Sequence, residues 1–186
     1  MNLLIVGAGG HGRCCLDIAR DMNVFNKIAF LDDSHVNEVI NDCTVIGTID
    51  KMSSYYPEYT NIFVAIGNNK VRSKLMQQVK EIGYSLPILK HSTSVVSKYA
   101  SIGDGTVVFA NAVVEANAVI KEGCIIATNS VVNHDVYIDE CVLVNTASVI
   151  RPNTVINKYA SIGSRCLITA NKTIDKELII KDGEVI

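Results

Sequence analysis

The glycine-rich segment GAGGHG, residues 7–12, is the first stretch of this chain whose residue types and spacing could do chemistry. Gly7, Gly9 and Gly12 match the G-x-G-x-x-G spacing of dinucleotide-binding turns, after an apolar run and before a helical pattern. Such a turn presents backbone N–H groups at a helix N-terminus, where a phosphate can bind. Taken alone, the segment predicts a nicotinamide- or flavin-dependent oxidoreductase, or a site for another phosphate-bearing ligand.

Polar residues follow two further apolar runs in the same half of the chain. Asp32 and Asp33 come about 20 residues after Gly12, where carboxylates accept hydrogen bonds from a nucleotide. Gly67 and Asn68 follow the third run. Because ligands of parallel sheets collect at the carboxyl ends of the strands, we expect these residues near the glycine-rich turn.

Histidines are the candidates for proton transfer, because imidazole titrates near neutral pH. The chain has four of them: His11, His35, His91 and His134. Only two lie in the second half of the chain, which is too few for a three-histidine metal site. We therefore expect no metal.

Composition excludes several classes of function. The net charge of −2, with scattered Lys and Arg residues, argues against a nucleic-acid surface. No apolar stretch approaches the roughly 20 residues that cross a bilayer, and no basic segment precedes the short N-terminal apolar run, so neither a membrane span nor a signal peptide is expected. The six cysteines show no metal-ligand spacing and no C-x-x-C motif, which is typical of reduced thiols in a cytoplasmic protein.

The elements that must position these residues differ between the two halves. Residues 1–90 alternate apolar, strand-like runs with amphipathic helical patterns. We expect strands at 2–6, 27–33, 61–69 and 85–89, and helices at 11–22 and about 70–82. This alternation predicts a small parallel sheet with helices on its faces.

After Lys90 the helical signals disappear and a period of six begins. An aliphatic residue recurs at every sixth position: Val96, Ile102, Val108, Val114, Ile120, Ile126, Val132, Ile138, Val144, Ile150, Ile156, Ile162, Ile168, Ile174, Ile180 and Ile186. A small residue stands two positions before most of them, as Ala112 does before Val114. This period predicts a hexapeptide β-helix, with three hexads in each 18-residue coil, the aliphatic residues stacked inside and the small residues at the inner corners.

The order of these motifs resembles the sialic acid O-acetyltransferase and UDP-4-amino-sugar N-acetyltransferase family of bacterial glycan biosynthesis. The resemblance rests on GAGGHG at 7–12, FLDD at 30–33, VAIGNNKVR at 64–72, the hexapeptide array and NHD at 133–135. It implies an α/β, Rossmann-like domain over 1–90 that binds a sugar or nucleotide sugar, followed by an all-β, left-handed β-helix acyltransferase domain over 91–186. It also implies a homotrimer with acetyl-CoA, the co-substrate, between adjacent β-helices.

The same resemblance assigns roles to single residues. His134 matches the general base that accepts a proton from the attacking amine or hydroxyl, and its register places it outside the prism. Asp135 matches the acidic residue that holds the imidazole, although neighbours on a strand point apart, so the pairing needs a bend. Substrate binding is expected at Gly9, Gly10, His11, Asp32, Asp33 and Gly67. Coenzyme contacts are expected by register at Leu143, Gly163 and Ser164.

Two departures from the family pattern affect the predicted chemistry. Leu143 stands where many members have a second histidine, and Pro152 stands where many have a glycine whose N–H meets the thioester oxygen. Proline has no N–H to donate, so another amide must serve or activity is weakened. The chain also stops at GEVI without the family's usual terminal loop.

These observations lead to one expected function and to alternatives. We expect an acetyl-CoA-dependent acetyltransferase that acts directly on the 4-amine of a UDP-4-amino-4,6-dideoxy sugar. One alternative is a sialic-acid-like sugar O-acetyltransferase, and another is an impaired β-helix that serves binding or assembly. A nicotinamide-dependent oxidoreductase is disfavoured, because a hexapeptide prism is not a usual substrate domain for hydride transfer.

Overall fold

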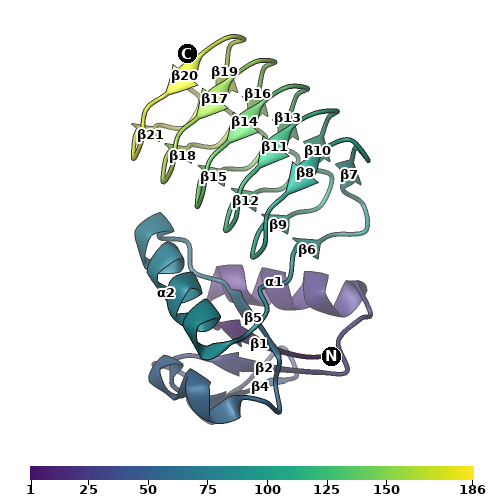
Figure 1. Cartoon of the computed structure of the whole chain (residues 1–186), viewed down its shortest axis with the longest axis vertical. Helices are drawn as coiled ribbons and strands as arrows, with labels where there is room; N and C mark the ends of the chain where they lie inside the picture. Colours follow the sequence, from purple (N-terminus) through teal and green to yellow (C-terminus); the bar gives the residue numbers. More distant parts are fainter. The chain divides into compact units, whose positions relative to one another are not determined.

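A computed structural model describes all residues from Met1 to Ile186. The chain divides into two compact units, Met1–Leu89 and Lys90–Ile186 (Figure 1). The first is a Rossmann-like α/β unit, and the second is a left-handed parallel β-helix.

The first unit is built on a five-stranded sheet whose strand order is β3-β4-β2-β1-β5. Its strands are β1 (Asn2–Val6), β2 (Lys27–Leu31), β3 (Val39–Ile40), β4 (Cys43–Gly47) and β5 (Asn61–Val64). All neighbouring pairs are parallel except β3 with β4. In β1, which lies between β2 and β5, residues 3–6 are fully buried, which is typical of parallel strands covered on both faces.

Helices follow β1 and β5 after short connecting segments. Helix α1 (Gly10–Asp21) starts at the glycine-rich turn, and its N-cap residue, Gly9, supplies no side-chain hydrogen bond. Helix α2 (Asn69–Ile82) is capped by the Asn68 side chain, which accepts hydrogen bonds from two first-turn amides, and it ends at Gly83. A 3-10 helix, η1 (Ile49–Tyr55), lies between β4 and β5.

The structure corrects parts of the predicted strand pattern in this unit. Strands β2 and β5 end at Leu31 and Val64, because the polar and glycine-containing segments that follow leave the sheet. Only Leu89 of the strand predicted at 85–89 lies in a strand, although Ser85 forms a single bridge to Asn61. The hairpin of β3 and β4 was not predicted, since β3 has only two residues, too few for a visible alternation.

The second unit is a prism of three sheets, and one coil contributes one short strand to each. The first sheet holds β7 (Val95–Val96), β10 (Val113–Val114), β13 (Val131–Val132), β16 (Val149–Ile150) and β19 (Leu167–Ile168). The second holds β8 (Ser101–Ile102), β11 (Val119–Ile120), β14 (Tyr137–Ile138), β17 (Val155–Ile156) and β20 (Thr173–Ile174). The third holds β6 (Leu89–Lys90), β9 (Val107–Val108), β12 (Ile125–Ile126), β15 (Leu143–Val144), β18 (Ser161–Ile162) and β21 (Ile179–Ile180).

Coils stack in register at a spacing of 18 residues, and they follow one another along the prism in Figure 1. Val114 pairs with Val132, and Ile138 pairs with Ile156. The aliphatic column that the sequence predicted is buried along most of the prism, from Val108 to Ile180. Fully burying one such side chain stabilises the fold by about 1.5–3 kcal/mol. The buried column is therefore a main source of the stability of the prism.

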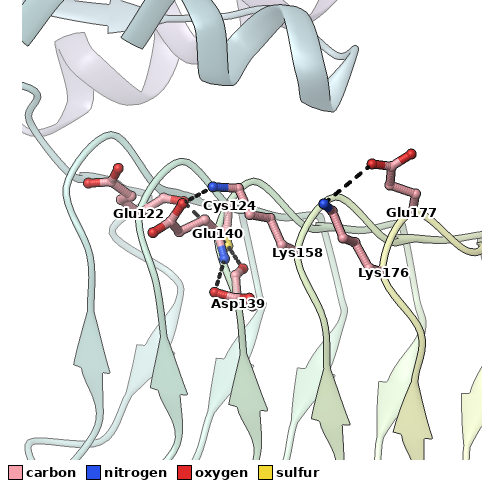
Figure 2. Close-up of polar contacts among 7 residues, drawn as sticks. All are labelled: Glu122, Cys124, Asp139, Glu140, Lys158, Lys176 and Glu177. Atoms are coloured by element: carbon pink, nitrogen blue, oxygen red, sulfur yellow. Dashed lines mark hydrogen bonds and ion pairs between the residues drawn. The ribbon is translucent and has the colours of Figure 1, made fainter. Parts of the chain in front are cut away.

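The corner between the second and third sheets carries polar contacts between coils (Figure 2). Lys158 forms an ion pair with Glu140 on the preceding coil, which raises the pKa of its ammonium. The buried thiol of Cys124 donates to the carbonyl oxygen of Asp139, with Sγ 3.1 Å from that oxygen. These contacts join coils, and Cys124 fills an inner corner as its register predicted.

Candidate functional site

His134 and Asp135 form a hydrogen-bonded pair at the corner between the first and second sheets. Both lie in the turn that joins β13 to β14, and their side chains are about half exposed. Asp135 has a φ of 58°, which supplies the bend that the pairing requires. Nδ1 of His134 lies 2.7 Å from Oδ2 of Asp135. Because an ionised carboxylate only accepts hydrogen bonds, Nδ1 is the donor in this contact, and in the neutral imidazole Nε2 is then the acceptor.

Two residues of the preceding coil hold this pair. The Glu115 carboxylate accepts a hydrogen bond from the backbone N–H of His134 at 2.9 Å. The Asn117 side-chain amide donates to Oδ1 of Asp135 at 3.1 Å. The hydrogen bonds from His134 and Asn117 lower the pKa of the Asp135 carboxyl, which therefore remains ionised at neutral pH.

Glu115 and Asn117 were not predicted as site residues, but the 18-residue coil period places them beside the pair. They lie 19 and 18 residues before their partners, which is one coil of the prism.

The coil that follows His134 presents Pro152 and Asn153. The carbonyl of Pro152 accepts a hydrogen bond from the N–H of Asn171 on the next coil, at 3.1 Å. In the same way, the N–H of Asp135 donates to the carbonyl of Ala116. The N–H of Asn153 breaks this pattern, because it makes no hydrogen bond to the carbonyl of His134 or to any other group. An unpaired backbone donor thus lies one coil from the histidine.

The expected coenzyme residues lie elsewhere on the prism. Leu143 is in β15 of the third sheet, whereas His134 occupies the corner between the other two sheets. A Cβ on Gly163 would lie 2.6 Å from the backbone nitrogen of Asp182, so coil stacking itself requires this glycine. The N–H of Ser164 donates to the Asp182 carboxylate at 2.7 Å. Within one chain, the structure does not bring these three residues to His134.

In the first unit, Gly7 and Gly12 of the glycine-rich turn differ from the three glycines predicted to bind substrate, Gly9, Gly10 and Gly67. A Cβ on Gly12 would lie 1.9 Å from the carbonyl oxygen of Gly7, so helix packing forbids a side chain there. Gly7 has a φ of 99° and is crowded by the Ala65 carbonyl. By contrast, a Cβ on Gly9 or Gly67 would meet nothing within 4 Å. Gly10 is nearly as open, with only an Arg13 nitrogen at 4.0 Å.

The two predicted acidic residues bind backbone amides beside the glycine-rich turn. The Asp32 carboxylate accepts from the N–H groups of Ala8 and Ser34, at 2.8 and 2.9 Å. Asp33 accepts from the N–H of Ile49 at 2.8 Å. Asp32 therefore holds the glycine-rich turn in place.

His11 lies in the first turn of α1, next to the open glycines. Its Nε2 lies 3.8 Å from Sγ of Cys15. Burial, together with the positive charge of Arg72, lowers the pKa of His11 to about 4. The imidazole is therefore neutral at pH 7 and can donate or accept a hydrogen bond there.

The structure contains neither a cluster of metal ligands nor a membrane-spanning helix. No group of three or more His, Cys, Asp or Glu side chains is arranged to hold a metal ion. No helix is both long enough and apolar enough to cross a membrane.

Comparison with known proteins connects this architecture to a class of enzymes. The family description "PglD N-terminal domain" matches residues 2–79, and "Bacterial transferase hexapeptide (six repeats)" matches residues 99–134. The acetyltransferase domain of PglB from Neisseria gonorrhoeae, solved with acetyl coenzyme A, is 34% identical. Its alignment covers 99% of this chain and 94% of that one, with a TM-score of 0.74. The fold and site therefore define a hexapeptide-repeat acetyltransferase with a PglD-type N-terminal domain.

Two further similar proteins are named as N-acetyltransferases of amino sugars. Perosamine N-acetyltransferase from Caulobacter crescentus, solved as a mutant with CoA and GDP-perosamine, is 25% identical with a TM-score of 0.81. That alignment covers 100% of this chain and 88% of the other. UDP-N-acetylbacillosamine N-acetyltransferase from Bacillus subtilis is 30% identical over 112 residues, 59% of this chain. The matched region spans about half (51%) of the length of that curated relative. This chain belongs to the UDP-4-amino-sugar N-acetyltransferase family.

Proposed function

We propose that this protein transfers the acetyl group of acetyl-CoA to the amine of a nucleotide-linked amino sugar. The 4-amine of a UDP-4-amino-4,6-dideoxy sugar is the acceptor that we favour. The hydrogen-bonded pair of His134 and Asp135 carries this proposal, because Nδ1 donates to Asp135, so that Nε2 of the neutral ring can accept a proton, and the side chain is half exposed. Relatives that act on nucleotide-linked amino sugars support the class of acceptor.

In this mechanism His134 is the general base of a direct transfer. As the amine nitrogen attacks the thioester carbonyl, Nε2 accepts its proton, and the ionised Asp135 stabilises the resulting imidazolium. Collapse of the tetrahedral intermediate breaks the C–S bond. The protonated His134 then gives its proton to the CoA thiolate, which leaves as the free thiol. No covalent enzyme intermediate is involved, and the buried Cys124 and Cys141 take no part.

The backbone N–H of Asn153 is the donor that we assign to the oxygen of this intermediate. It lies one residue beyond Pro152, which has no N–H, and it makes no hydrogen bond within the chain. A preorganised backbone N–H stabilises a developing oxyanion, and loss of one such donor costs about 10²–10³ in rate.

The nucleotide sugar binds at the carboxyl edge of the sheet in the first unit. Gly9, Gly10 and Gly67 leave their backbones open to a ligand, and the α1 N-terminus suits a phosphate. His11 adds a neutral imidazole beside them. Asp32 keeps the turn in shape, while Asp33 lies beside it at the same edge.

Assembly into a homotrimer explains how acetyl-CoA reaches His134. Leu143, Gly163 and Ser164 lie away from His134 in one chain, so a coenzyme held against them must reach the His134 of an adjacent subunit. Outward-facing apolar side chains flank the His134 corner and suit contact between subunits: Val113, Val131, Val149, Val119, Tyr137 and Val155. The six free cysteines suit the reducing cytoplasm.

A second candidate is a β-helix that binds a sugar without transferring acetyl groups. Leu143 and Pro152, which replace two groups of the family pattern, favour this alternative. O-acetylation of a sialic-acid-like sugar uses the same base and differs only in the acceptor.

One assay separates these functions. The purified chain is mixed with acetyl-CoA and either a UDP-4-amino-4,6-dideoxy sugar or a free nonulosonic acid, and release of free thiol is followed. We expect release with the amino sugar alone. Release only with the nonulosonic acid would establish the O-acetyltransferase, and no release with either would support the binding protein.

A further inference from the structure

Arg72 is a buried cation that the proposed mechanism does not use. It is the fourth residue of α2, and only 1% of its surface is exposed. Nη1 donates to the carbonyl oxygens of Ile66 and Gly67, at 2.8 and 3.0 Å, and Nη2 donates to Oδ1 of Asn69 at 2.7 Å. The guanidinium therefore binds two carbonyl groups of the short segment that connects β5 to α2, and the side chain of the first residue of α2.

Fold stability alone does not explain this position. A buried charge is costly, and the first turn of a helix disfavours a cation, because the helix dipole is positive there. Well-packed apolar residues often replace a buried charge with no loss of stability. The guanidinium nevertheless satisfies these particular carbonyl groups, which implies that the conformation of residues 66–69 matters beyond packing.

The segment that Arg72 holds contains one of the two most open glycines. Gly67 offers its carbonyl to the guanidinium, yet a Cβ on Gly67 would contact nothing. The charge of Arg72 also acts on His11 at the start of α1. Arg72 thus links the two segments, after β1 and after β5, that form the proposed edge of the nucleotide-sugar site.

We propose that Arg72 is a positioning residue for nucleotide-sugar binding: its hydrogen bonds to Ile66, Gly67 and Asn69 fix this segment so that the backbone of Gly67 can lie against the ligand. The inference rests on the proposed function for the identity of the ligand. Acetyl transfer at His134 does not involve Arg72, so its loss affects binding of one substrate and spares the chemical step.

The test compares Arg72→Met and Arg72→Lys with Arg20→Met, a matched change at an exposed arginine of α1. We expect Arg72→Met to raise KM for the nucleotide sugar at least tenfold, with kcat changed less than threefold and KM for acetyl-CoA unchanged. Lysine can still donate to the carbonyl groups, so Arg72→Lys recovers part of the affinity. Arg20→Met matches the wild type.

Two sets of results would overturn the proposal. One is an unchanged KM for the nucleotide sugar in folded Arg72→Met. The other is an equal loss in kcat and in both KM values, which indicates a general structural role. If Arg72→Met does not fold, the same criteria apply to Arg72→Lys.

Calorimetric titration with UDP and with GDP separates this inference from the proposed function. If the wild type binds either nucleotide but acetylates nothing, the proposed function fails. In that case, weaker nucleotide binding by at least tenfold in Arg72→Met upholds the role of Arg72. Equal binding by wild type and variant, or no binding by the wild type, overturns it.

Discussion

At the scale of residues, the proposed chemistry rests on the pair of His134 and Asp135, which the preceding coil holds in place. Asp135 lies in a left-handed turn conformation, which turns its carboxylate toward the neighbouring imidazole. Asn117 then donates to the other carboxylate oxygen and keeps the pKa of Asp135 low. The pair is therefore preorganised for proton transfer, and each partner can be tested alone.

Replacing Asp135 with Asn tests the role of the carboxylate. Without its negative charge, the protonated imidazole is less favourable, so we expect a rate loss of about 10²–10⁴ and an acid limb of kcat/KM that moves to lower pH. A pH–rate profile of Asp135→Asn against the wild type measures both. An acid limb that stays in place would show that Asp135 does not act on His134.

Alanine substitutions at Gly67 and Gly12 separate ligand binding from packing, because only Gly67 has space for a Cβ. Gly67→Ala meets no atom within 4 Å, so we expect an unchanged melting temperature and weaker binding of the nucleotide sugar. Gly12→Ala places a Cβ 1.9 Å from the Gly7 carbonyl oxygen, so we expect clear destabilisation. Thermal melting and substrate KM check the two. Normal binding by Gly67→Ala would remove this glycine from the site.

At the scale of elements, His11 in the first helix makes the free energy of unfolding depend on pH. The pKa of His11 is about 4 in the folded chain because of burial and Arg72, against about 6.5 when unfolded. The unfolded state therefore binds the extra proton between these values, and the free energy of unfolding falls as pH drops from about 6.5 to 4. The loss is at most about 3 kcal/mol.

The His11→Gln variant isolates this contribution. Glutamine does not titrate, so urea unfolding of the variant at pH 7.5 and pH 4.5 should show a smaller loss of stability than the wild type. Identical losses in the two proteins would assign the pH dependence to other groups.

The prism was more predictable from sequence than the α/β unit, for a physical reason. Each coil repeats one constraint, an aliphatic residue such as Val132 or Ile138 inside, so the period is visible along the whole half. The hairpin around Asn41 and Asp42 depends on one local turn with positive φ, which leaves no periodic trace. Glu115 and Asn117, which support the pair of His134 and Asp135, do so through contacts between coils. These contacts become evident only when the 18-residue register is applied.

At the scale of the whole molecule, the distance in the fold between His134 and the expected coenzyme residues favours a site shared between subunits. If so, charge on the apolar surface beside His134 should break the assembly. We expect Val131→Glu to shift the trimer to monomer in sedimentation analysis and to abolish acetyl transfer, because the side chain of β13 faces outward. Lys98→Glu, at an exposed site, serves as the control for added negative charge. A fully active monomer would contradict the shared site.

The central claim is that His134 takes the proton in acetyl transfer to an amino sugar. Its most direct test is the single-turnover rate of amide formation from acetyl-CoA and the UDP-4-amino sugar, followed by mass spectrometry, in wild type, His134→Asn and His35→Asn. We predict that His134→Asn slows the chemical step by about 10²–10⁴ and that His35→Asn, an exposed histidine of the first unit, does not change it. An undiminished single-turnover rate in His134→Asn would contradict the mechanism.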